Sequence, residues 1–194
     1  MSSTLSETET RILDATLVLL ENGDGEAVRM SDIAKAAGIS RQAVYLHFPS
    51  RTALLIAATH HLDRRKGSEA RLAPSRAAKS GRERLAAYVE AWATYIPEIY
   101  GMAKAFLARA EKDTAAAEAW DERMEDMREG CEAAVRALAR DGDLADGFSE
   151  AEATDLLWTL LSVRNWELLT KTRSWSQERY LAAMQESARR LLVR

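Results

Sequence analysis

Hydrophobic positions recur every three or four residues along most of the chain, which is the period of amphipathic helices. Near the N-terminus this pattern predicts four helices, at about residues 7–21, 31–37 and 41–48 and from Ser50 to a point between residues 65 and 71. In the remainder it predicts five more, at about residues 85–97, 97–107, 114–140, 149–172 and 176–192. No segment shows the alternating pattern of a strand. The sequence therefore predicts an all-α protein of about nine helices.

The second and third predicted helices are short and are joined by a glycine. Gly38 suits the left-handed backbone that ends one helix, and Ser40 is a good N-cap for the next. Val44 and Phe48 lie one turn apart, so both are expected to face inward. Two short helices with such a turn are typical of a helix-turn-helix, whose second helix fits the DNA major groove.

The outward positions of that second helix carry hydrogen-bond donors. Arg41 and Gln42 are suited to bidentate contacts with base edges, whereas the Tyr45 phenol and the His47 imidazole suit phosphate oxygens. Arg51 follows closely. These residue types favour a nucleic-acid interface over a helical corner with no role in DNA binding.

This stretch resembles the DNA-binding signature of the TetR family of bacterial transcriptional regulators. The similar segments are Asp32-Ile33-Ala34, Ala37-Gly38-Ile39-Ser40 and Tyr45-Leu46-His47-Phe48-Pro49-Ser50-Arg51-Thr52-Ala53-Leu54-Leu55. The resemblance implies that Tyr45, His47 and Arg51 contact phosphates. Arg41 and Gln42 would then read base edges, and Ala43 could touch a thymine methyl group.

The chain departs from the family pattern at Arg29, which stands where a capping threonine is usual. Ser31 is then the nearest expected cap. Arg29 either reaches a phosphate or is a solvent-exposed arginine. The candidate DNA-binding residues are Arg29, Ser40, Arg41, Gln42, Ala43, Tyr45, His47 and Arg51.

Charge is distributed unevenly along the chain. Residues 27–82 hold eleven basic and three acidic residues, a net charge of +8, although the whole chain has a net charge of −3. A basic segment in an acidic chain is typical of a local nucleic-acid surface. Residues 73–81, with Pro74 and Gly81, are predicted to be a linker between a DNA-binding domain at 1–72 (motif at about 29–48) and a helical domain at 82–194 that binds a ligand and dimerises.

Aromatic and methionine side chains gather in the second domain, where they suit a pocket for flat or apolar ligands. A packed helical core is the alternative for each of them. Arg164 and Asn165 are either hydrogen-bonding anchors of a subunit interface or groups that bind a polar ligand atom. The candidate pocket residues are Trp92, Tyr95, Phe106, Trp120, Met124, Met127, Cys131, Trp158, Arg164 and Asn165.

The helix expected at 149–172 is apolar on more than one side, which predicts burial. We expect it to pack with the last helix against a second copy of the chain, forming a four-helix homodimer seam. No catalytic or phosphate-loop motif is present, so no enzymatic activity and no cofactor are expected. His60 and His61 are adjacent and point about 100° apart, which disfavours a metal site.

Two further observations concern location. The single cysteine, Cys131, excludes an intramolecular disulfide, and neither a signal-peptide pattern nor a long apolar run occurs. A cytoplasmic location is therefore expected, with no membrane partner. The sequence favours a homodimeric, ligand-responsive transcriptional repressor that binds a near-palindromic DNA operator. The alternative is a helical small-molecule-binding module without sequence-specific DNA binding.

Overall fold

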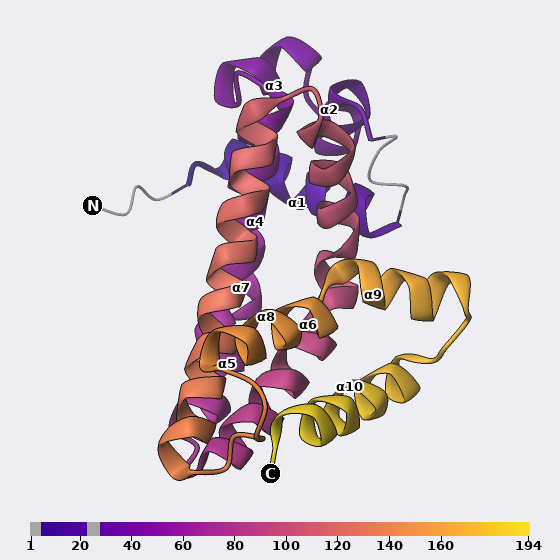
Figure 1. Cartoon of the computed structure of the whole chain (residues 1–194). Coiled ribbons are helices and arrows are strands. Elements are labelled where there is room, and N and C mark those ends of the chain that lie inside the picture. The colour runs from indigo at the N-terminus through magenta and orange to yellow at the C-terminus, as the bar shows by residue number, and fades with distance from the viewer. Residues whose placement is uncertain (1–4, 23–27) are drawn as a thin grey trace. The chain divides into compact units, whose positions relative to one another are not determined.

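A computed structural model describes residues 5–22 and 28–194, which are mostly helical and, over that range, contain no strand (Figure 1). The all-α prediction of about nine helices is confirmed. The chain divides into two compact units: unit 1 is Met1–Gly67 with Ile99–Asp121, and unit 2 is Ser68–Glu98 with Glu122–Arg194. Within the described ranges, no helix has the length and apolar character needed to span a bilayer.

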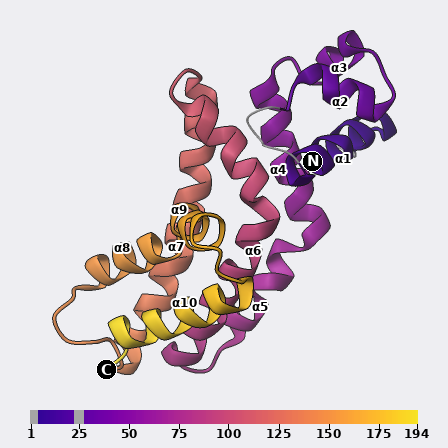
Figure 2. The ribbon, with the colours of Figure 1, turned by 90° about the vertical axis from the view of Figure 1, so that its right-hand side faces the viewer.

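Unit 1 contains four N-terminal helices that pack around one small core. They are α1 (Glu7–Asn22), α2 (Met30–Ala37), α3 (Arg41–His47) and α4 (Arg51–Lys66). Helix α1 packs against α2 and α4, and α2 packs against α3, as Figures 1 and 2 show. The side chains that fill this core are Ile12, Leu13, Ile33, Val44, Leu54 and Leu55.

Asp14 links α1 to α4 at the edge of this core. Its Oδ1 lies 2.9 Å from His61 Nε2 and 2.6 Å from Arg65 Nη1. His61 is buried, whereas His60 is exposed. The His61 ring therefore contributes to the packing of two helices.

Unit 1 also includes parts of two long helices, α6 (Gly81–Ala110) and α7 (Thr114–Asp141). The backbone of α6 lies against that of α1 at Gly101. A Cβ atom placed at this residue would be only 1.9 Å from Leu20 O. No side chain fits in that space. Gly101 thus permits a close contact between the backbones of two helices.

Unit 2 is built from seven helical segments. Besides parts of α6 and α7 it contains α5 (Ser68–Ala77), α8 (Glu150–Leu160), α9 (Val163–Glu167), the π-helical segment η1 (Leu168–Thr172) and α10 (Gln177–Leu192). Its core contains Val89, Ile96, Val135, Leu138, Leu157, Leu161, Tyr180 and Leu192. The residues predicted to be a linker, 73–81, are helical as far as Ala77.

The prediction that one helix ends at Pro97 and another begins there is wrong. Helix α6 continues through Pro97 without a break. Proline has no backbone N–H, so the carbonyl of Ala93 loses its usual partner four residues later. Gln177 of α10 supplies the missing hydrogen bond, because its Nε2 donates to Ala93 O at 2.8 Å, while its Oε1 accepts from Trp166 Nε1 at 2.8 Å.

The substitution Gln177→Met should lower the free energy of unfolding by about 2 kcal/mol. It removes the acceptor of Trp166 Nε1 and leaves the Ala93 carbonyl without this donor. Urea unfolding measures the effect. Gln185→Met, the same change on the same helix, is the control and should have little effect. Equal stability of the two variants would contradict a role for Gln177 in continuing α6.

The prediction of one helix over 149–172 is also wrong. Its start is as expected, since Ser149 and Glu152 form a capping box, but α8 ends at Leu160 and a new helix is capped by Ser162. Side-chain donors reach the carbonyls at this break. Asn165 Nδ2 donates to Thr159 O at 2.6 Å, and Trp92 Nε1 donates to Leu161 O at 2.9 Å.

Candidate nucleic-acid interface and ligand pocket

The turn between α2 and α3 has the predicted geometry. Gly38 adopts a left-handed conformation with φ 68°, and its backbone N–H and that of Ile39 donate to carbonyls of the last turn of α2. Ser40 has extended backbone and its Oγ accepts from Ala43 N at 3.1 Å. Val44 and Phe48 are buried, as expected. These contacts fix the direction in which α3 leaves the turn.

The cap of α2 differs from the prediction. The helix begins at Met30 with Arg29 as its N-cap, so the assignment of Ser31 as the cap is wrong. Asp32 in the first turn binds the backbone of this cap residue, since its Oδ2 accepts from Arg29 N at 3.0 Å. An acidic side chain in the first turn also interacts favourably with the helix dipole. Arg29 itself is exposed.

Helix α3 presents a row of polar side chains to solvent. Arg41, Gln42 and Tyr45 are exposed. Arg41 Nη2 lies 3.5 Å from Tyr45 Oη, and its Cζ lies 5.6 Å from the centre of the Tyr45 ring. The guanidinium thus lies beside the phenol, one helical turn away. Leu46 on the same helix is 81% exposed, and an apolar side chain there can touch thymine methyl groups.

The remaining candidates on α3 are less exposed. His47 is half-buried, and its Nδ1 lies 3.8 Å from Glu9 Oε1 of α1. Ala43 is half-buried, and its backbone N–H is used by the Ser40 cap. The pKa of Glu9 is lowered, first by its hydrogen bonds with Ser6 and to a smaller extent by His47. A carboxylate from outside the motif thus lies near the imidazole.

Arg51 is the first residue of α4 and is half-buried. Burial lowers the pKa of its guanidinium, and the positive charge of Arg109 lowers it further. The next residue, Thr52, donates from Oγ1 to Asp113 Oδ2 at 2.5 Å. The N-terminal turn of α4 therefore contacts the loop between α6 and α7.

Sequence reasoning missed Leu46, Glu9, Thr52 and Asp113. Asp113 before Thr114 is recognisable as an N-cap, and its Oδ1 accepts from Ala116 N at 3.3 Å. Its contact with Thr52 spans 61 positions in the sequence, so no local pattern could have found it.

Two tryptophans among the predicted pocket residues of unit 2 donate hydrogen bonds to backbone carbonyls of the same unit. Trp158 Nε1 donates to Met124 O at 3.2 Å, as Trp92 Nε1 does to Leu161 O. Met127 O accepts from the buried Tyr88 hydroxyl at 2.7 Å. Burial raises the pKa of Cys131 to about 12, so this thiol is neutral. These contacts tie neighbouring helices of the unit together.

The remaining candidate pocket residues are divided between the two units. Phe106 and Trp120 belong to unit 1. Arg164 has a side chain that is 70% exposed, with Nη1 3.0 Å from Glu167 Oε2, and Asn165 caps the end of α8. Tyr95 is buried, with the Arg71 guanidinium stacked 4.2 Å from its ring centre and the Trp92 ring edge-on at 6.0 Å.

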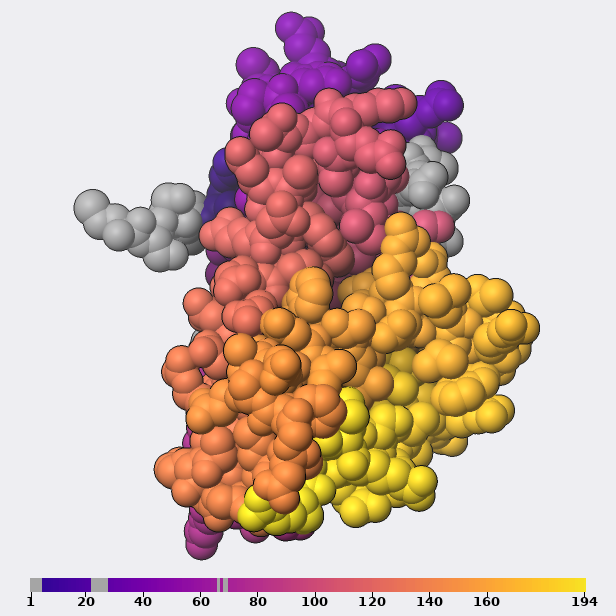
Figure 3. Space-filling model, in the orientation of Figure 1, coloured from indigo at the N-terminus to yellow at the C-terminus, as the bar shows by residue number. Residues whose placement is uncertain are grey.

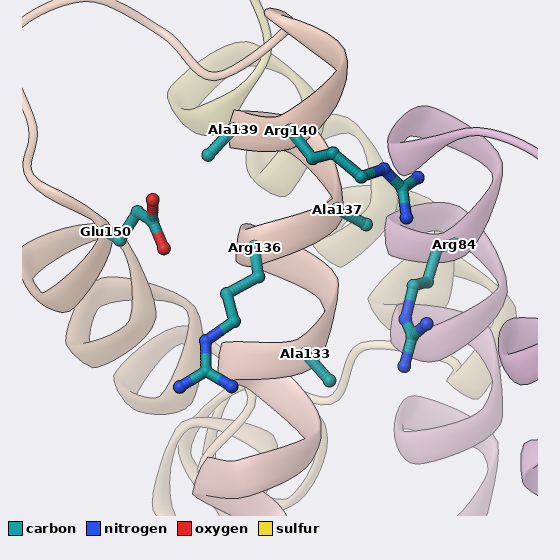
Figure 4. Close-up of a pocket in the computed structure, with 7 residues that line it drawn as sticks. All are labelled: Arg84, Ala133, Arg136, Ala137, Ala139, Arg140 and Glu150. Atoms are coloured by element: carbon teal, nitrogen blue, oxygen red, sulfur yellow. The ribbon is translucent and has the colours of Figure 1, made fainter.

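Two grooves in unit 2 have other linings. One, of about 600 Å³, runs between α6, α7 and the start of α8, where Figure 4 shows three arginines around a floor of alanines. Its lining residues are Arg84, Ala133, Arg136, Ala137, Ala139, Arg140 and Glu150. The other, of about 360 Å³, lies between the start of α6 and α10. Neither contains a predicted pocket residue, so the pocket assignment stays a prediction.

The N-terminal helices match known regulators in sequence. Residues 12–58 match the family described as bacterial regulatory proteins, tetR family. An HTH-type transcriptional regulator of Mycobacterium tuberculosis is 48% identical over 59 residues, which are 30% of this chain and 29% of that protein. The HTH-type transcriptional repressor KstR of Rhodococcus jostii is 42% identical over 57 residues, 29% of this chain and 27% of KstR. The chain thus matches less than a third of the length of these relatives.

The whole chain is similar in fold to solved regulators. A transcriptional regulator from Saccharomonospora viridis, in complex with choline, superposes with a TM-score of 0.83 over 98% of this chain and 100% of that one, at 20% identity. At this identity the similarity concerns the fold alone. The sequence match covers α2, α3 and their turn, where Gly38 and Ser40 have the geometry described above. The N-terminal domain of the chain is thus similar to that of the tetR family of bacterial regulatory proteins.

Proposed function

We propose that the protein is a transcriptional regulator that binds DNA by inserting α3 into the major groove. The observation that carries this proposal is the exposed row of Arg41, Gln42 and Tyr45 on a helix whose direction is fixed by Gly38 and Ser40. Arginine and glutamine read base edges, and tyrosine suits phosphate. Arg51 and His47 flank this row and would contact the backbone.

The protein acts as a homodimer in this proposal, through α8 and α10. These helices pack against each other, and residues 150–194 form a continuous surface on the face seen in Figure 3. Apolar side chains remain partly accessible there, among them Leu160, Leu181 and Leu191. A twofold axis through this seam would relate two heads, and the operator would then be nearly palindromic.

A small molecule bound by the helical body would control DNA binding. The S. viridis regulator of similar fold holds choline, and KstR is named a repressor; both support a ligand-responsive repressor here. The protein would act by binding rather than by catalysis, in the cytoplasm. In this proposal the ligand pocket is lined by the aromatic residues Trp92, Tyr95 and Trp158.

Selection of duplexes from a random DNA pool tests the proposal. The full chain should enrich a near-palindromic sequence, and its affinity for that duplex should fall steeply with added salt as counterions are released from the phosphates. Failure to enrich any sequence, with no salt-dependent binding to any duplex, would instead favour a helical small-molecule-binding module without sequence-specific DNA binding.

Arg51→Ala should weaken binding to the selected duplex and to a scrambled duplex by the same factor, and should reduce the salt slope by about one. Fluorescence anisotropy titrations in a salt series measure both quantities. Arg64→Ala is the matched control, since Arg64 is exposed on the same helix about 20 Å further along. Loss of affinity for the selected duplex alone would contradict a phosphate contact by Arg51.

A further inference from the structure

One carboxylate joins three helices of unit 1. Asp113 lies between α6 and α7, and its Oδ2 accepts from Thr52 Oγ1 at 2.5 Å and pairs with Arg109 Nη2 at 3.1 Å. Its Oδ1 caps α7 through Ala116 N. The N-terminal turn of α4, the end of α6 and the start of α7 therefore share a single acceptor group.

The same turn of α4 carries Arg51, next to Thr52. Arg109 lies close enough to Arg51 for its charge to lower the pKa of the Arg51 guanidinium, in addition to the effect of burial. Two arginines that close repel each other. Asp113 pairs with Arg109 and so compensates this repulsion.

Asp113 is held in its charged form. Its pKa is lowered first by the hydrogen bond from Thr52, and then by those from Arg109 and Ala116 and by the charge of Arg109. A charged hydrogen bond is shorter and stronger than a neutral one. The carboxylate is thus suited to fix the side chain of Thr52, and with it the first turn of α4.

We propose that Asp113 is a positioning residue for DNA binding, which holds the first turn of α4 so that Arg51 meets the phosphate backbone. This inference rests on the proposed function, because it assumes that Arg51 contacts DNA. It assigns the loop between α6 and α7 a part in DNA binding, although this loop lies outside the helix-turn-helix. Asp113 acts through Thr52 and Arg109 and need not touch DNA itself.

The direction in which DNA affinity changes when the Asp113 charge is removed distinguishes a positioning role from a purely electrostatic effect. Removing a negative charge near DNA strengthens binding if only electrostatic repulsion matters. Positioning predicts the opposite. Asp113→Asn should weaken binding to the selected duplex by about threefold to tenfold, as should Thr52→Val, which removes the hydroxyl donor. Asparagine keeps the cap of α7, so Asp113→Asn should remain folded.

Glu111→Gln is the matched control, since it neutralises an exposed carboxylate in the same loop. It should bind DNA as tightly as the unaltered protein or slightly tighter. Anisotropy titrations of the selected duplex measure all three variants, and circular dichroism melting checks their folding. If Asp113→Asn and Thr52→Val both bind at least as tightly as the unaltered protein, the inference is wrong.

A double-mutant cycle provides a readout that a purely structural role would not move. Arg51→Ala should reduce affinity less in the Asp113→Asn background than in the unaltered protein, because Arg51 is no longer well placed there. Equal reductions in the two backgrounds would overturn the inference. If the unaltered protein binds no duplex, the proposed function fails, whereas normal binding with additive substitutions rejects only the role of Asp113.

Discussion

Replacing both Arg41 and Gln42 by alanine should weaken binding to the selected operator by about 100-fold, since each bidentate contact with a base contributes about 1–3 kcal/mol. Both side chains lie in the first turn of α3 and are exposed, so their removal should leave the fold intact. Tyr45 keeps its place on the helix, although it loses its contact with the Arg41 guanidinium.

Anisotropy titrations against the selected duplex and a scrambled duplex measure this effect. Affinity for the scrambled duplex should fall only a few-fold, the effect of one lost positive charge. Combined Arg64→Ala and Gln185→Ala removes the same residue types outside α3 and should leave the preference for the selected duplex unchanged. An equal loss on both duplexes would show that Arg41 and Gln42 do not read bases.

Gly101→Ala should destabilise the protein by about 3 kcal/mol, because overpacking against backbone leaves few ways to relax. The new Cβ would lie 1.9 Å from Leu20 O, within the contact of α6 and α1. Alanine is otherwise the better helix former by about 1 kcal/mol. Gly101→Ala should therefore lower the free energy of unfolding, whereas helix propensity alone would raise it.

Ala108→Gly is the reverse control on the same helix. Ala108 is exposed, so the change should cost about 1 kcal/mol through propensity alone. Urea unfolding of both variants, with the denaturant slope checked for two-state behaviour, measures the difference. A Gly101→Ala variant as stable as the unaltered protein would disprove the close helix contact.

Features that depend on neighbouring residues could be predicted from the sequence. The left-handed Gly38 and the cap at Ser40 follow from chemistry within one helical turn. The buried face of α3 followed in the same way from its periodicity. The location of the candidate DNA interface could therefore be predicted before the structure was known.

Features that depend on distant partners could not be predicted. Proline ends most helices, yet α6 continues through Pro97 because a donor from α10 replaces the lost bond. The break after Leu160 is likewise stabilised by Trp92, which lies 69 positions before the carbonyl it binds. A pocket requires space between side chains. Residue type alone does not distinguish a residue that lines such a space from one that is packed in the core.

The composition of unit 1 bears on how such proteins can be recombined. Its helices α1–α4 are complemented by Ile99–Asp121, which supplies Gly101 against Leu20 and Asp113 against Thr52. A chimaera that exchanges only residues 1–67 between two regulators would pair one parent's α1 and α4 with the other parent's α6–α7 loop. The exchangeable module is therefore discontinuous in the gene, and a functional graft must carry both segments.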